Sequence, residues 1–284
     1  MPAPNPQINV IGGMPKSGST LLCNILNQNP AFHASDTSPL GLSVARSISA
    51  ITGRPEYISE LAKNEEMVKT QLSSMARSQV HGWYKPILGD EKTVIFDKDR
   101  SNVWLYQHEI FPTLFPKGRM IMMVRDPREV FGRILKVRAE DPLVRDSENP
   151  THRTLEAQAD LMMGPNGLVG SSIMAIQDVL QRGNAKNFAT DHVLFIEYEN
   201  FVRNPKRALE GIYKELEIDY FDHDFENVIN VAGDFDPQYR NQWKHRSAGK
   251  VEPQAPIWPL YVPRGIAKSL LDRYPIFCQA FKYA

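Results

Sequence analysis

The chain has 284 residues, enough to bury a substantial core without help from disulfides or metals. Apolar residues make up 42% of it, and 33 basic side chains balance 33 acidic ones. This balance argues against bulk attraction to nucleic acid or to an anionic membrane, and no apolar stretch is long enough for a membrane-spanning helix. The first residues do not resemble a signal peptide. Cys23 and Cys278 are expected to be free thiols, and a disulfide between them is the alternative. We therefore expect a cytoplasmic protein.

Strands and helices are predicted to alternate over most of the chain. Short apolar runs predict strands within residues 8–13, 31–35, 92–97, 118–127 and 192–201. Helical spacing of apolar residues predicts helices within residues 19–30, 40–51, 55–80, 100–115, 127–140, 151–182 and 204–218. This order is typical of an α/β fold with a doubly wound parallel sheet flanked by helices.

The composition changes from about residue 219, where the chain becomes polar, aromatic and rich in proline. We expect an irregular, lid-like part here with one closing helix near residues 265–274. It is interpreted as part of the same domain, so that residues 1–284 form a single unit.

The segment GGMPKSGSTLL, residues 12–22, joins the first predicted strand to the first predicted helix. Backbone N–H groups of such a loop, together with the helix N-terminus, form an anion site, and Ser19 and Thr20 add hydroxyl donors. Gly13 and Gly18 have the spacing of a Walker A loop, but Ser19 stands where that loop has its lysine, and Lys16 lies inside the loop instead. The shift disfavours an ATP or GTP site and indicates a lysine beside the bond between a 5′-phosphate and its transferring group. A glycine-rich turn without a ligand is the alternative.

This loop resembles the 5′-phosphosulfate loop of the sulfotransferases that use 3′-phosphoadenosine-5′-phosphosulfate (PAPS). The resemblance is nearer to the tyrosylprotein and bacterial type than to the soluble small-molecule type, and it implies a P-loop-like sulfotransferase architecture. It also implies that the desulfated product, PAP, is released, that no metal is needed, and that Lys16 is catalytic. The cosubstrate-binding residues it implies in the loop are Lys16, Ser17, Gly18, Ser19 and Thr20.

Three further segments resemble the same family in the same order. MIMMVRDPREVFGRILK resembles the 3′-phosphate segment, which makes Arg125 the phosphate ligand; a surface pair of Arg125 with Asp126 is the alternative. Arg133 stands where the family usually has serine, and it either binds the phosphate directly, as a further cosubstrate-binding residue, or points away. TVIFDKDRSNVW makes Lys98 the second active-site lysine, or else part of a solvated run of charges. VLFIEYENF places Tyr198 near the adenine, or else in the core.

The segment WKHRSAGK, residues 243–250, offers a closing contact to the nucleotide, although a solvated loop fits equally well. Its candidate cosubstrate-binding residues are Arg246, Ser247 and Lys250.

The resemblance leaves the general base open. The soluble enzymes place a histidine two residues after the second lysine, where this chain has Arg100, and the tyrosylprotein enzymes use a glutamate after the second strand. In the corresponding stretch FHASDTSPL the one carboxylate is Asp36, one position before the aligned Thr37. Asp36 is the expected base and His33 the alternative. A role without chemistry is also open for Asp36, as the cap of a helix that starts near Ser38.

The predicted function is transfer of a sulfuryl group from PAPS to an acceptor hydroxyl or amine. Two alternatives remain: a P-loop nucleotide kinase or NTPase, and a noncatalytic nucleotide-binding protein with the same fold. The acceptor is left open among small molecules, carbohydrates and peptides, and the oligomeric state is left open as well.

Overall fold

The computed structural model describes residues 6–89, 92–99, 111–140, 154–183, 192–231 and 247–283, without the side chain of Asp36. Its centre is a five-stranded, fully parallel sheet in the order β2-β3-β1-β4-β5. This confirms the predicted doubly wound α/β fold. The strands are β1 (Gln7–Gly13), β2 (Phe32–Thr37), β3 (Val94–Lys98), β4 (Met120–Val124) and β5 (Val193–Glu197).

The strand register brings the chemistry-bearing segments to one edge of the sheet. Ile11 of β1 pairs with Lys98 of β3, and Gly13 pairs with Met123 of β4. Val124 in turn pairs with Glu197 of β5. All five strands run in the same direction, so their carboxyl ends lie together. The next two strands in the chain, β2 and β3, lie on one side of β1, and β4 and β5 lie on its other side. The strand order therefore reverses at β1, and α/β proteins bind ligands at such a switch point.

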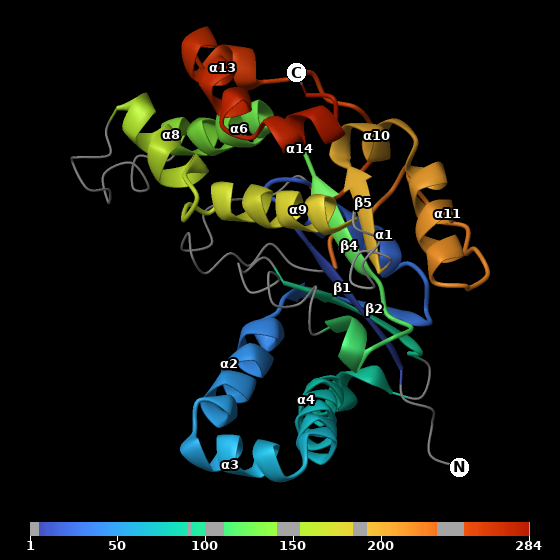
Figure 1. Cartoon of the computed structure of the whole chain (residues 1–284). Helices are drawn as coiled ribbons and strands as arrows, with labels where there is room; N and C mark the ends of the chain where they lie inside the picture. The colour runs from blue at the N-terminus through green and yellow to red at the C-terminus, as the bar shows by residue number, and fades with distance from the viewer. Residues whose placement is uncertain are drawn as a thin grey trace.

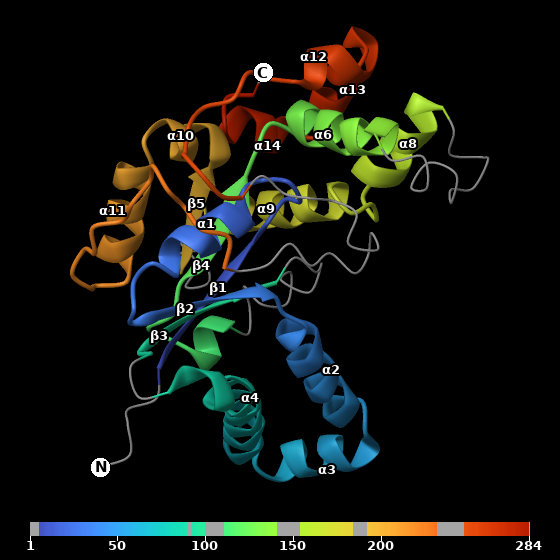
Figure 2. The ribbon, with the colours of Figure 1, turned by 180° about the vertical axis from the view of Figure 1, so that it is seen from behind.

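Helices cover both faces of the sheet (Figures 1 and 2). On one face, α1 (Ser19–Leu26), α10 (Tyr198–Arg203) and α11 (Pro205–Glu215) enclose an apolar cluster around Phe96 and Met123. On the opposite face, α6 (Pro127–Glu140), α8 (Leu155–Met163) and α9 (Gly170–Gly183) enclose a second cluster around Met122 and Phe131. Every residue of β4 is buried, as expected for a central parallel strand without polar alternation.

Three helices project from the edge of the sheet as an arm: α2 (Leu40–Thr52), α3 (Pro55–Lys63) and α4 (Glu65–Leu88) (Figure 1). The sequence predicted a single helix over residues 55–80, but the structure divides it at Asn64. The side chain of Asn64 accepts a hydrogen bond from the N–H of Met67 and so caps a new helix. The arm packs back on the sheet through Tyr84, which is fully buried.

The C-terminal part contains more helix than predicted. Besides α13 (Arg264–Asp272), which matches the expected closing helix, it forms α12 (Trp258–Tyr261) and α14 (Pro275–Ala280). Leu270 and Phe277 are fully buried in the cluster that α6 and α9 share. Because α12 and α14 are very short and carry proline in their first turn, they lack the periodicity by which a sequence reveals a helix.

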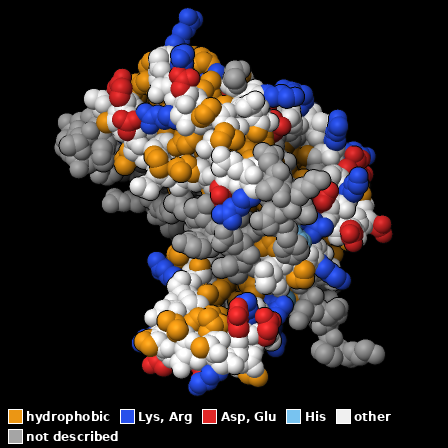
Figure 3. All heavy atoms as spheres, viewed as in Figure 1, with side chains coloured by type: hydrophobic (Ala, Val, Ile, Leu, Met, Phe, Trp, Pro, Cys, Tyr) orange, Lys and Arg blue, Asp and Glu red, His pale blue; other side chains and the backbone are white. Residues whose placement is uncertain are grey.

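Both cysteines are free and buried, as expected. On the face seen in Figure 3, basic and acidic side chains are interspersed over the described residues, in keeping with the balanced charge. None of the described helices is long and apolar enough to cross a membrane.

Candidate active site

The loop between β1 and α1 is held by close backbone packing. Gly13 has φ 114°, and a Cβ atom there would lie 2.1 Å from the carbonyl oxygen of Met123 and collide with it. Gly18 has φ 91°, and a Cβ atom there would lie 2.6 Å from the ring of Tyr198. Glycine is therefore required at both positions. Lys16 also has a positive φ, 57°, which L residues rarely adopt and which is common at functional sites.

The start of α1 is open to an anion. Gly18 is its N-cap residue and no side chain caps the helix, so Ser19 and Thr20 form its first turn rather than its cap. Ser17 turns inward, and its hydroxyl donates to the carbonyl of Met14. Ser17 thus stabilises the loop through its side chain, and any contact with a ligand would come from its backbone.

A cavity of about 330 Å³ lies above this loop. Its lining combines the loop, the segment after β4, one side of α6 and part of the C-terminal segment. The lining residues are Lys16, Gly18, Ser19, Thr20, Leu21, Arg125, Arg133, Lys136, Val137, Glu140, Tyr198, Ser247 and Gln254. Four of them are basic and one is acidic, so the site favours an anion.

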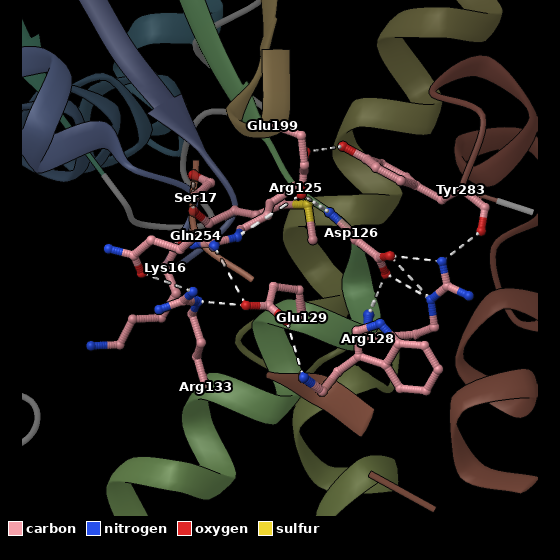
Figure 4. Close-up of polar contacts among 12 residues, drawn as sticks. Lys16, Ser17, Arg125, Asp126, Arg128, Glu129, Arg133, Glu199, Gln254 and Tyr283 are labelled. Atoms are coloured by element: carbon pink, nitrogen blue, oxygen red, sulfur yellow. Dashed lines mark hydrogen bonds and ion pairs between the residues drawn. The ribbon is translucent and has the colours of Figure 1, made fainter. Parts of the chain in front are cut away.

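Arg125 is aimed at the loop, not at its neighbour Asp126. Its Nη1 donates to the carbonyl of Lys16 at 2.7 Å (Figure 4). Its guanidinium lies 3.7 Å from the centroid of the Tyr198 ring. Asp126 instead binds Arg128 with both carboxylate oxygens, at 2.7 to 3.1 Å. Burial, followed by the nearby charge of Arg133, lowers the pKa of Arg125. The surface-pair alternative for Arg125 is therefore wrong.

Arg133 lies one helical turn beyond Glu129 on α6 and lines the same cavity. Its Nε donates to Glu129 Oε1 at 2.8 Å, and its Nη2 donates to Gln254 Oε1 at 3.3 Å (Figure 4). The arginine that replaces the family's serine thus belongs to the cavity wall. Two guanidinium groups, from Arg125 and Arg133, face one space.

Lys98 lies at the end of β3 and is fully buried, so it is not part of a solvated run of charges. Its Nζ donates to Oγ1 of Thr20 at 3.2 Å. This contact joins the end of β3 to the first turn of α1. It places the ammonium group of Lys98 beside a residue that lines the cavity.

Comparison with known proteins agrees with this geometry. The model of the sulfotransferase family matches residues 9–222 of the chain. The chain belongs to the sulfotransferase family. No curated protein sequence matches it.

Solved structures share the fold of this sulfotransferase. The sulfotransferase domain of the Synechococcus PCC 7002 olefin synthase aligns over 97% of both chains with 17% identity and a TM-score of 0.51. The sulfotransferase domain from the curacin biosynthetic pathway aligns over 98% of both chains with 16% identity and a TM-score of 0.52. Mouse sulfotransferase SULT7A1, complexed with PAP, aligns over 99% of this chain and 90% of its own, with 13% identity and a TM-score of 0.53.

Three candidate residues of the sulfotransferase lie away from the cavity or outside the described residues. Lys250 is exposed, and its Nζ pairs with Glu226 Oε2 at 2.8 Å, so its ammonium group is engaged at the surface. Arg246 falls outside the described residues, and so does the side chain of Asp36. At the start of α2, the hydroxyl of Ser38 accepts a hydrogen bond from the N–H of Leu40.

Among the described residues, no three His, Cys, Asp or Glu side chains are grouped so that they could hold a metal ion.

A second cavity, of about 520 Å³, lies along β2 and the arm. His33 lines it, and burial, followed by the charge of Lys92, lowers the pKa of His33. Thr37 also lines it and pairs in register with Lys98, and the N–H of Ser38 donates to the Lys98 carbonyl at 2.7 Å. This cavity therefore borders the strand end that carries Lys98.

Sequence reasoning missed a buried network next to Lys98. The hydroxyl of Tyr84, on α4, donates to Oδ1 of Asp97, which points to the opposite face of the sheet from Lys98. Burial raises the pKa of Asp97 to about 6; hydrogen bonds from Tyr84 and Ser38 oppose this rise, and the charge of Asp99 adds to it. The alternation of side chains along β3 could have indicated that Asp97 faces inward, but not that a tyrosine of the arm would meet it.

We expect Asp97→Asn to stabilise the protein at neutral pH and not at acidic pH. The folded-state pKa of Asp97 is raised, so the cost of ionising this carboxyl is absent below its usual pKa and fully present above about pH 6. Asparagine keeps an acceptor for Tyr84 without the charge. The gain in unfolding free energy should grow to about 3 kcal/mol between pH 4 and pH 7.

Urea unfolding of both proteins across this range measures the effect. Asp219→Asn, at an exposed position, is the control and should show no such trend. A gain for Asp97→Asn that is the same at pH 4 and pH 7 would contradict the raised pKa.

Proposed function

We propose that this sulfotransferase transfers the sulfuryl group of PAPS to an acceptor hydroxyl or amine. The observation that carries the proposal is the convergence of Lys16, Arg125 and Arg133 on one cavity at the switch point of the sheet. The loop and the N-terminus of α1 suit a 5′-phosphate. The two guanidinium groups suit a separate phosphate on the 3′ position of the ribose, a group that PAPS has and ATP lacks.

Tyr198, which is expected to lie near the adenine, has a further task in this proposal. One face of its ring is covered by Arg125 and its edge contacts Gly18. The ring therefore holds the guanidinium in place through a cation–π contact, and an adenine would meet only the remaining surface of the phenol.

In this reaction the protein stabilises developing negative charge and forms no covalent bond with the sulfuryl group. The bond between sulfur and the oxygen of the 5′-phosphate breaks, a bond between sulfur and the acceptor oxygen forms, and negative charge develops on the leaving phosphate. Lys16, in the cavity lining, and Lys98, bound to Thr20 in the first turn of α1, would stabilise this charge. The hydroxyl groups of Ser19 and Thr20 would hold the 5′-phosphate.

The acceptor is proposed to enter through the second cavity, because that cavity borders the strand end that carries Lys98. Its proton would pass to Asp36, in β2, with His33 as the alternative. A neutral imidazole can accept a proton, and the lowered pKa of His33 keeps it neutral at pH 7. Small molecules, carbohydrates and peptides are all candidate acceptors, and the cytoplasmic location stays a prediction.

Asp36→Asn should lower kcat by about 10²- to 10⁴-fold and leave PAP affinity almost unchanged, because a general base acts on the acceptor and not on the nucleotide. Turnover measured with saturating labelled PAPS, beside the Kd of PAP from calorimetry, separates the two effects. Unchanged turnover would remove Asp36 as the base. His33→Gln then becomes the variant to compare.

Ligand-induced stabilisation tests the cosubstrate. PAP at about 100 times its Kd should stabilise the fold by about 2.7 kcal/mol, while ATP with magnesium at the same concentration should have a much smaller effect. Labelled PAPS offered with a phenol, a sugar alcohol and a tyrosine peptide then tests transfer. Stronger stabilisation by ATP would favour the kinase alternative, and binding of PAP without transfer to any acceptor class would favour the noncatalytic one.

A further inference from the structure

Glu129 is a buried carboxylate in the first turn of α6, directly beneath the two arginines of the cavity. Its Oε1 accepts from Arg133 Nε at 2.8 Å and lies 3.6 Å from Arg125 Nη2. Its Oε2 accepts from the backbone N–H groups of Ile257 and Trp258, at 2.9 and 3.1 Å. One side chain therefore contacts both guanidinium groups and the C-terminal segment.

A carboxylate beside an anion site needs a reason, since its charge opposes the anion. The two backbone N–H groups fix Oε2, and the N-terminus of α6 favours a negative charge at this position. With Oε2 fixed, Oε1 becomes a rigid point to which both arginines are drawn. Arg125 and Arg133 repel each other, and a charge between them allows both to stay in one small space.

The same carboxylate ties part of the cavity wall to α6. Gln254, whose side chain accepts from Arg133, lines the cavity, and the chain continues from it to the N–H groups that bind Glu129. The segment approaches α6 very closely at Gly132, where a Cβ atom would lie 2.8 Å from Cα of Trp258. The guanidinium of Arg128 lies 5.0 Å from the centroid of the Trp258 ring and adds a further contact.

Arg125 does not use all of its N–H groups within the protein. Its Nη1 is used by the carbonyl of Lys16, but its buried Nε has no hydrogen-bond partner among the described residues. The side chain of Glu199 lies 4.0 Å from this Nε and is held by the hydroxyl of Tyr283. Carboxylates thus orient the guanidinium without using all of its N–H groups.

We propose that Glu129 is a positioning residue that aims Arg125 and Arg133 at the 3′-phosphate and holds the wall segment 254–258 beside them. The inference rests on the proposed function, because it assumes that the second anion in the cavity is that phosphate. Glu129 then contributes to the discrimination between nucleotides: the binding of a nucleotide with a 3′-phosphate depends on Glu129, and the binding of one without it does not.

Calorimetry with PAP and AMP, which differ only in the 3′-phosphate, tests the assignment. Glu129→Gln keeps the size of the side chain and removes its charge, and should weaken PAP binding by about 10- to 30-fold while AMP affinity changes less than about threefold. Glu210→Gln, on the exposed side of α11, is the matched control and should leave both affinities unchanged. An equal loss for PAP and AMP would indicate a merely structural role and overturn the inference, as would tighter PAP binding.

A second variant keeps the test decisive if Glu129→Gln fails to fold. Glu129→Asp preserves the charge but shortens the reach to the arginines, and should lower the ratio of PAP to AMP affinity by at least about threefold. An unchanged ratio would show that the position of the carboxylate is unimportant and overturn the inference alone. No binding of PAP by the wild-type protein would overturn the proposed function, and this inference with it.

Discussion

Replacing Lys16 with alanine should abolish sulfuryl transfer in a protein that stays folded, with kcat lower by about 10³-fold or more. The substitution removes an ammonium group from the cavity lining but keeps the Lys16 carbonyl, to which Arg125 is bound. Alanine and lysine experience similar strain at the positive φ of this position, so the loop should keep its shape. The loss is therefore expected in catalysis and not in stability.

Transfer from labelled PAPS at saturation, together with a thermal unfolding curve, measures both quantities. Lys214→Ala, at an exposed position of α11, is the matched control and should behave as wild type. Retained transfer in Lys16→Ala would overturn the assignment of the whole loop to the 5′-phosphosulfate.

Arg125→Lys should weaken PAP binding by about 30- to 100-fold even though the charge is conserved. A guanidinium can hold a phosphate with two parallel hydrogen bonds while also donating to the Lys16 carbonyl and stacking on Tyr198, whereas an ammonium group is a single point of charge. Lysine still offers a cation to Glu129 and Glu199, which limits the effect on folding.

AMP provides the internal comparison for this variant. The affinity for AMP should fall much less than the affinity for PAP, because AMP has no 3′-phosphate for Arg125 to bind. Arg203→Lys, at an exposed position of α10, serves as the control. Equal losses for the two nucleotides would show that Arg125 acts only through the shape of the loop.

The sheet and the site loop could be predicted because their signals are local. Apolar runs such as residues 120–124 identify buried parallel strands, and the glycines around Lys16 identify a loop that approaches a phosphate. Helix ends were predicted less well. Asn64 divides a helix that periodicity alone joins, and the short helices α12 and α14 have too few turns to show any periodicity.

The contacts between distant residues were not predictable in the same way. Whether Arg125 pairs with Asp126 or reaches Lys16 depends on how β4 sits beside β1, which a sequence pattern does not contain. The same holds for Lys98, whose partner Thr20 lies 78 positions away in the chain.

By itself the sequence determined the class of the fold, the anion-binding loop and the cations available to it, since each depends on residues that are neighbours in the chain. Only the tertiary structure decided how those cations are held. Glu129 contacts two arginines and accepts hydrogen bonds from the backbone of residues 257–258, and Tyr84 of the arm donates a hydrogen bond to Asp97. Such contacts form when elements pack, because packing alone sets which buried charges must share a partner.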